Sequence, residues 1–118
     1  MGEMNMNIQI FGFKNCFDTK KAERYFKERR IKYQFIDLKE KSLSKRELES
    51  VRVSVKDINK LINPKAKEYK ILNIGLIRTN SVKEEILFKN PKLYKTPIVR
   101  NGKQATVGYE PEVWALWE

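Results

Sequence analysis

The apolar and polar positions near the start of the chain change from a strand pattern to a helix pattern around one cysteine, Cys16. Residues 7–11 form a short, mainly apolar run, which is typical of a buried β-strand. From residue 18 to about residue 30, apolar side chains recur at helical spacing between charged ones, and they are Ala22, Tyr25 and Phe26. Residues 32–37 alternate and predict a second strand, so this order implies a right-handed parallel crossover.

The middle of the chain, residues 41–90, has helical patterns and no strand signal. Short helical pieces are expected over residues 58–62 and residues 65–72. Asn63-Pro64 separates these two pieces, because the residue before a proline avoids helical geometry.

Two pairs of residues in this middle part match the capping box, in which a serine and a glutamate satisfy free N–H groups at a helix start. Ser44 and Glu47 predict one helix, with an apolar face made by Leu48, Val51 and Val55. Ser81 and Glu84 predict another helix, over residues 82–89.

Strand patterns return at residues 97–100 and 105–107. The Asn101-Gly102 pair between them is a strong signal for a β-hairpin turn. A last helix is predicted to begin at Pro111, and two of its side chains are expected to anchor the core, namely Trp114 and Trp117.

This order of elements predicts an α/β protein of thioredoxin-like fold: a βαβ unit, a helical insertion, a β-hairpin and a C-terminal helix. We expect a single domain over residues 1–118, since this length supports a core without disulfide or metal staples. Its core is predicted in residues 7–40 and 91–118, and its insertion in residues 41–90.

The balance of charge is strongly basic, with 25 Lys and Arg against 15 Asp and Glu and a net charge of +10. Such a surface attracts anions such as small oxyanions or acidic proteins. The lysines are spread from Lys14 to Lys103, however, which favours a solvated surface, and we do not expect nucleic acid as a partner.

The chain has one cysteine and no histidine. These counts exclude an internal disulfide and any Cys-His or Ser-His-Asp arrangement, and we expect no metal site. Residues 1–7 lack the pattern of a secretory signal, and no apolar stretch approaches the roughly 20 residues of a membrane span. We therefore expect a cytoplasmic protein with no membrane partner.

Cys16 lies where a strand passes into a helix, and this position favours a reactive thiolate because free N–H groups and the helix dipole stabilise negative charge. The positive charge of Lys14, close in sequence, would also stabilise the thiolate. The negative charge of Asp18 would destabilise the thiolate, unless its carboxylate is occupied in capping the helix. The alternative is that Cys16 is only a small buried apolar residue.

Several motifs in order along the chain resemble the arsenate reductase (ArsC)/Spx family, which has a thioredoxin-like fold. They are Gly12-Phe-Lys-Asn-Cys16, Lys20-Lys-Ala22, Asp37-Leu-Lys39, Leu61-Ile-Asn-Pro-Lys65, Leu93-Tyr-Lys-Thr-Pro-Ile-Val99 and Thr106-Val-Gly-Tyr109. The likeness is greatest to the uncharacterised branch with an Asn-Cys loop and a C-x-x-T sequence.

The resemblance implies roles for several residues. Cys16 matches the catalytic cysteine, and Pro97 matches a proline that is cis beside it. Thr19 stands where Spx proteins carry a second cysteine, so a switch disulfide is absent. The oxyanion-binding arginines of arsenate reductases match Thr96, Asn63 and the Gly108-Tyr109 pair, and none of these is arginine.

Lysines are the candidates to replace the missing arginines, although ammonium is a point charge without the bidentate fork. Lys14, Lys65 and Lys95 are considered for this role. The residues predicted to bind substrate or a thiol partner are Lys14, Asn15, Thr19, Lys95, Thr96 and Pro97.

The expected reaction is that of a thiol-dependent oxidoreductase. Cys16 attacks an oxyanion such as arsenate, or a disulfide, and glutathione or glutaredoxin resolves the adduct. Glutathione is thus a co-substrate, and no bound cofactor is expected. The alternative, also implied by the resemblance, is an Spx-like regulator that binds the RNA polymerase α subunit without catalysis.

Overall fold

The computed structural model, which describes residues 6–117, contains one four-stranded sheet in the order β2-β1-β3-β4. The strands are β1 (Ile8–Gly12), β2 (Tyr33–Asp37), β3 (Ile98–Asn101) and β4 (Gln104–Val107). β1 and β2 are parallel and are joined through α1 (Phe17–Glu28), as predicted. β3 pairs antiparallel with both β1 and β4, and Gly102 in the hairpin has a positive φ of 61°.

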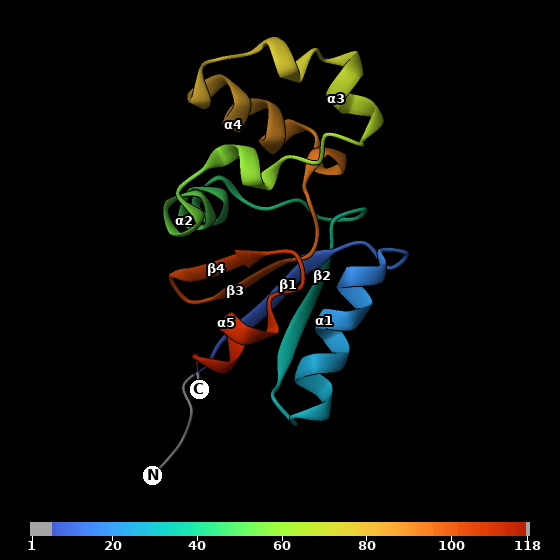
Figure 1. Ribbon diagram of the computed structural model, residues 1–118, viewed down its shortest axis with the longest axis vertical. Helices are drawn as coiled ribbons and strands as arrows, with labels where there is room; N and C mark the ends of the chain where they lie inside the picture. Colours follow the sequence, from blue (N-terminus) through green and yellow to red (C-terminus); the bar gives the residue numbers. More distant parts are fainter. Residues whose placement is uncertain (1–5, 118) are drawn as a thin grey trace.

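Each face of the sheet carries its own buried cluster, because successive side chains of a strand point to opposite faces. Ile10 and Val99 pack on the face covered by α1 and α5 (Pro111–Ala115). Phe11 and Ile98 pack on the other face, against the helical insertion. Figure 1 shows α1 and α5 together in front of the sheet.

Trp114 anchors the cluster beneath α1 and α5. Its side chain is fully buried, with its ring centroid 5.1 Å from that of Tyr25, and its Nε1 donates a hydrogen bond of 2.8 Å to Thr106 Oγ1. Trp117 is only partly buried and packs against the same cluster. The prediction that tryptophans of the last helix contribute to the core is therefore confirmed, most strongly for Trp114.

The insertion stacks short helices above the sheet and gives the molecule extents of 49 × 27 × 24 Å (Figure 1). Its elements are α2 (Lys45–Val55), η1 (Ile58–Leu61), α3 (Lys67–Ile71), η2 (Ile74–Leu76), α4 (Asn80–Lys89) and η3 (Pro91–Leu93). A bridge between Ile62 and Tyr94 ties the insertion to the segment that leads into β3.

Of the two predicted capping boxes, one is correct and one is wrong. Ser44 N donates to Glu47 Oε1 at 2.8 Å, and Glu47 N donates to Ser44 Oγ at 3.1 Å, which completes the box of α2. In contrast, α4 begins at Asn80 after the extended residue Thr79. Ser81 is thus already inside the helix, where its hydroxyl has no free N–H group three residues ahead to cap.

Candidate active site

The end of β1 and the start of α1 hold Cys16 in place. Cys16 is the N-cap residue of α1, with an extended backbone, and its N–H donates to Phe13 O at 3.0 Å. The helix therefore begins one residue earlier than expected. Asp18 lies within its first turn and is not the N-cap that the sequence suggested.

Gly12 and Thr19 pack closely behind the cysteine. A Cβ atom on Gly12 would lie 2.7 Å from Thr19 Cγ2, and it would meet Thr19 Oγ1 as well. Thr19 is fully buried. The absence of a side chain at Gly12 thus allows the first turn of α1 to approach the end of β1.

Thr96 and Pro97 approach Cys16 from the loop before β3. The Thr96-Pro97 peptide bond is cis, as the family resemblance implied. Thr96 Oγ1 donates a hydrogen bond of 3.1 Å to Cys16 Sγ, and Sγ also lies 3.9 Å from the Thr96 carbonyl oxygen. Gly108 N donates to Pro97 O at 2.8 Å and fixes this loop against the turn after β4.

These surroundings lower the pKa of the Cys16 thiol. Partial burial alone would raise that pKa, but hydrogen bonds from the Thr19 and Thr96 side chains and from the backbone N–H groups of Thr19 and Asp18 outweigh it. Thr19 Oγ1 has no partner with full hydrogen-bond geometry among the described residues, so the Thr96 hydroxyl is the better-defined donor.

Cys16 opens onto a cleft of about 770 Å³ between the sheet and the insertion. Three of the predicted residues line the cleft together with the cysteine, namely Lys14, Asn15 and Thr96. Two others, Thr19 and Pro97, are buried next to it and do not line it. Lys95 does not line the cleft. Tyr94 and Thr96 both do, and in an extended segment the residue between them points the other way.

Three lysines of the cleft were missed by the sequence reasoning, namely Lys39, Lys67 and Lys92. Lys39 could have been found, because Asp37 pairs with Gly12 where the two parallel strands end. Lys67 and Lys92 come from α3 and η3, whose positions depend on packing of the insertion. Lys65, the candidate two residues before Lys67, lies outside the cleft.

Acidic side chains share the cleft with these lysines, so it presents both signs of charge. The acidic members are Asp37, Glu40 and Glu68, and the basic members are Lys14, Lys39, Lys67 and Lys92. No arginine among the described residues lines it. Of the positions that match the family's arginines, Asn63 and Thr96 line the cleft. Tyr109 lies outside it, with its ring centroid 5.5 Å from Lys21 Nζ.

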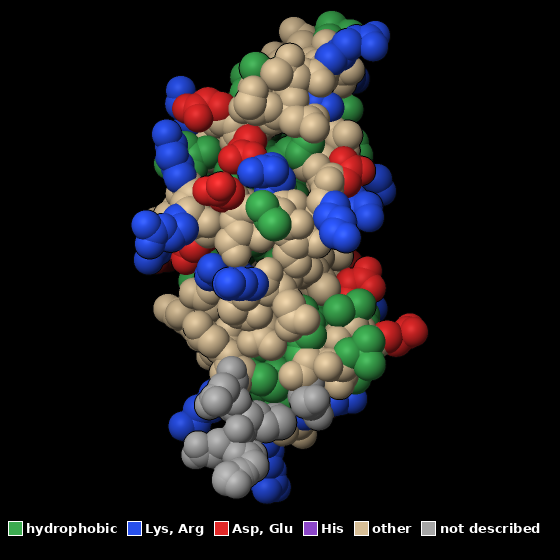
Figure 2. All heavy atoms as spheres, turned by 90° about the vertical axis from the view of Figure 1, so that its left-hand side faces the viewer, with side chains coloured by type: hydrophobic (Ala, Val, Ile, Leu, Met, Phe, Trp, Pro, Cys, Tyr) green, Lys and Arg blue, Asp and Glu red, His purple; other side chains and the backbone are tan. Residues whose placement is uncertain are grey.

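Charged side chains of both signs also gather outside the cleft, for example along α1 from Lys20 to Glu28. Figure 2 shows Lys and Arg side chains scattered over one face with Asp and Glu between them. Within residues 6–117, no three His, Cys, Asp or Glu side chains gather to hold a metal ion. None of the described helices is both long and apolar enough to cross a membrane.

Comparison with known proteins agrees with this architecture. The ArsC family model matches residues 11–116. The chain is 30% identical over 109 residues to the global transcriptional regulator Spx 2 of Oceanobacillus iheyensis, across 91% of this chain and 80% of that protein. An ArsC family related protein from Bacteroides fragilis has a TM-score of 0.85 at 24% identity, covering 97% of this chain and 99% of that one.

Arsenate reductase from Vibrio cholerae is similar in structure, with a TM-score of 0.84 at 24% identity over 96% of this chain and 98% of that one. The fold is thus the thioredoxin-like α/β fold predicted from the order of elements. The chain belongs to the ArsC family, as its motifs indicated.

Proposed function

We propose that this protein is a thiol-dependent oxidoreductase in which Cys16 forms a covalent adduct with its substrate. The observation that supports this most directly is the hydrogen bond from Thr96 Oγ1 to Cys16 Sγ beside the cis Pro97. A hydroxyl donor and a helix N-terminus both stabilise a thiolate, and the thiolate is the nucleophilic form of cysteine.

The shape and charge of the cleft support an organic disulfide as the first candidate substrate. Clefts of roughly 300–1,000 Å³ hold drug-sized molecules, and this one measures about 770 Å³. Glutathione carries both carboxylates and an ammonium group, and such a molecule suits a cleft with lysines and carboxylates together. Arsenate is the second candidate, since the lysines offer charge without the geometry of arginine.

With a disulfide, the Cys16 thiolate attacks one sulfur, a new S–S bond forms, and the other sulfur leaves as a thiolate that takes up a proton. A cysteine of glutaredoxin then attacks the mixed disulfide and releases Cys16, and the second cysteine of glutaredoxin takes over the disulfide as the last substrate thiol leaves. Glutathione can take this role for other disulfides, because with glutathione disulfide it would only regenerate the substrate. With arsenate, a Cys16–arsenic bond replaces an arsenic–oxygen bond and water leaves. Two external thiols then form a disulfide, and their two electrons reduce As(V) to As(III) as a second water leaves. Water finally replaces the sulfur on arsenic, which releases arsenite and returns Cys16 as a thiol.

Glutathione is thus a co-substrate and not a bound cofactor, and we propose a cytoplasmic location because glutathione and glutaredoxin supply the electrons there. The test is alkylation of Cys16 by iodoacetamide across a pH range, with and without glutathione disulfide or arsenate. We expect a lowered apparent pKa and protection by one of the two compounds, which names the substrate class. Glutathione-dependent turnover that persists in Cys16→Ser would overturn the proposal.

The second candidate is a regulatory role, which is favoured by the likeness to a protein named as a global transcriptional regulator. In this role the chain binds the C-terminal domain of the RNA polymerase α subunit and performs no catalysis. A pull-down with RNA polymerase separates the candidates. Binding that survives Cys16→Ser favours the regulator, whereas no binding leaves the thiol chemistry as the function.

A further inference from the structure

The tip of the insertion carries large aliphatic side chains that the core does not use. Ile71 is 71% exposed, Leu72 is 37% exposed and Leu76 is 79% exposed. They belong to the turn formed by α3 and η2, at the end of the molecule farthest from the sheet (Figure 1). Neighbouring apolar side chains left in water are a mark of protein association.

Local contacts fix this outward arrangement. Asn73 adopts the left-handed conformation with φ 53°, and Leu76 N donates to Asn73 O at 3.0 Å. Ile74 is buried in the core, and Gly75 lies against Tyr69, whose Oη would be 3.2 Å from a Cβ at that position. Because Ile74 and Tyr69 pack inward, Leu76 is left on the outside.

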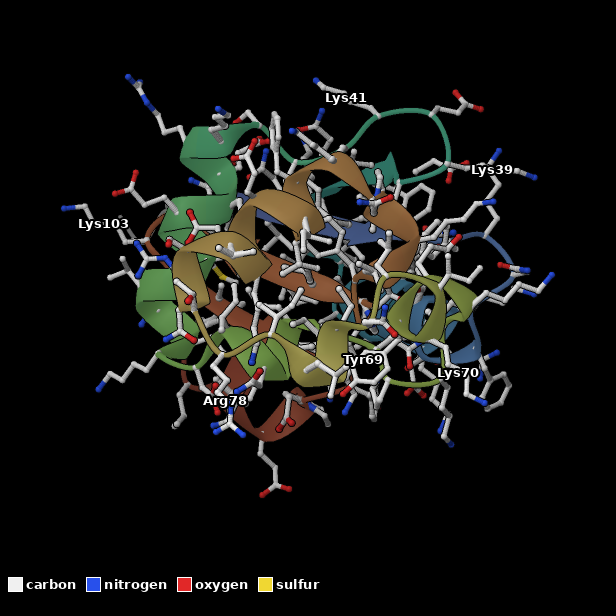
Figure 3. All side chains as sticks on the ribbon, turned by 90° about the horizontal axis from the view of Figure 1, so that it is seen from above. Lys39, Lys41, Tyr69, Lys70, Arg78 and Lys103 are labelled. Atoms are coloured by element: carbon white, nitrogen blue, oxygen red, sulfur yellow. The ribbon has the colours of Figure 1, made fainter. Side chains whose placement is uncertain are left out.

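The rim of these aliphatic side chains is cationic. Residues 69–79, which form this tip, contain two cations, Lys70 and Arg78, and no Asp or Glu. Seen from above the insertion, Lys70 and Arg78 lie to either side of Tyr69 along one edge of the molecule (Figure 3). The tip therefore combines an apolar centre with positive charge.

We propose that this tip surface, made by Ile71, Leu72, Leu76, Lys70 and Arg78, docks a protein whose matching surface is apolar at its centre and acidic at its rim. Charge complementarity selects this partner. A second copy of the chain fits poorly, because a two-fold interface would place Lys70 and Arg78 near the same cations of the other copy. Nucleic acid would meet the cations but would leave the aliphatic side chains without a partner. The proposal does not depend on the chemistry of Cys16.

The test places a photoreactive side chain at the tip, by Leu76→benzoylphenylalanine in the full chain, and crosslinks it in cells. The matched control is Val53→benzoylphenylalanine, at a residue of α2 that is 61% exposed. We expect a protein of net negative charge that crosslinks from position 76 and not from position 53. No crosslink beyond the control, or crosslinks to a second copy, a lipid, a nucleic acid or a basic protein, would each contradict the proposal.

The crosslinked protein is then purified and its Kd for this chain is measured by calorimetry. We expect Leu76→Ser, and the pair Lys70→Glu with Arg78→Glu, each to weaken binding about tenfold or more. Val53→Ser and Lys103→Glu serve as controls, with circular dichroism to confirm that every variant folds. Equal affinity of the tip variants and the controls would overturn the assignment of this surface.

Discussion

The Thr96 hydroxyl donates a hydrogen bond of 3.1 Å to Cys16 Sγ, and this contact joins two residues that are 80 positions apart. It brings a neutral donor to the thiol, at a position where the family resemblance implies an arginine in arsenate reductases. A hydroxyl can stabilise a thiolate on the protein, but it adds no positive charge for an oxyanion. This difference is a reason to test disulfides before arsenate.

Replacing this hydroxyl tests its effect on the thiol. In Thr96→Val the donor is lost with little change of volume, and we expect the pKa of Cys16 to rise, since a hydrogen bond to a charged group is stronger than one between neutral groups. Alkylation by iodoacetamide against pH measures this pKa. Thr79→Val, at an exposed residue of another loop, should leave the profile unchanged, and an unchanged profile in Thr96→Val would exclude the donor role.

The lowered pKa of Cys16 also predicts how stability varies with pH. Between that lowered pKa and the value of about 8.5 in the unfolded chain, the unfolded state binds more protons, so the stability contributed by Cys16 rises with pH and is complete above the unfolded value. It is lost as pH falls through the folded pKa. Urea unfolding of the wild type and Cys16→Ser at about pH 6 and about pH 9 measures this. The free energy of unfolding of the wild type, relative to that of the variant, should be larger at the higher pH. The opposite trend would contradict a lowered pKa of Cys16 in the folded protein.

Gly12→Ala tests the close packing behind the cysteine. The new methyl group would clash with Thr19, 2.7 Å from its Cγ2, and we expect a loss of about 1–3 kcal/mol in the free energy of unfolding. Adding Thr19→Ala removes the clashing atoms and should recover part of that loss. If the free energy of unfolding of the double variant equals the value expected by adding the two single losses, then the clash with Thr19 is not the cause of the loss in Gly12→Ala.

The two serine–glutamate pairs provide a matched test of helix capping. Ser44→Ala removes a hydrogen-bonded cap and should cost about 0.5–2 kcal/mol in the free energy of unfolding. Ser81→Ala removes a hydroxyl that caps no helix, and we expect little change. Thermal or urea unfolding of both variants gives the comparison, and equal losses would mean that Ser81 has a structural role as well.

The lysines near the site divide into those that line the cleft and those that do not. With glutaredoxin as the reductant, Lys92→Ala should raise the KM for glutathione disulfide about threefold or more with little change in kcat, because it removes a positive charge from the cleft proposed to bind this substrate. Lys95→Ala, three residues later, should leave KM unchanged because this side chain faces away. Steady-state kinetics of both variants test the placement, and an equal effect of the two substitutions would mean that only overall charge matters.

The sequence by itself determined the elements whose signals are local. The alternation of residues 7–11, the helical spacing of Ala22, Tyr25 and Phe26, and the Asn101-Gly102 turn each depend on neighbours a few positions away. These signals placed Cys16 at the junction of β1 and α1. The prediction of a capping box at Ser81 was wrong because a serine and a glutamate at this spacing also occur inside a helix. The start of α4 is set by the extended backbone of Thr79.

Only the tertiary structure decided which side chains share the cleft with Cys16. Lys67 and Lys65 are close in sequence, as are Lys92 and Lys95, yet one member of each pair faces the cleft and the other does not. Their directions follow from the bridge between Ile62 and Tyr94 and from the packing of α3 and η3 above the sheet. Such long-range contacts bring together residues from separate elements, and no pattern within a short window of sequence contains them.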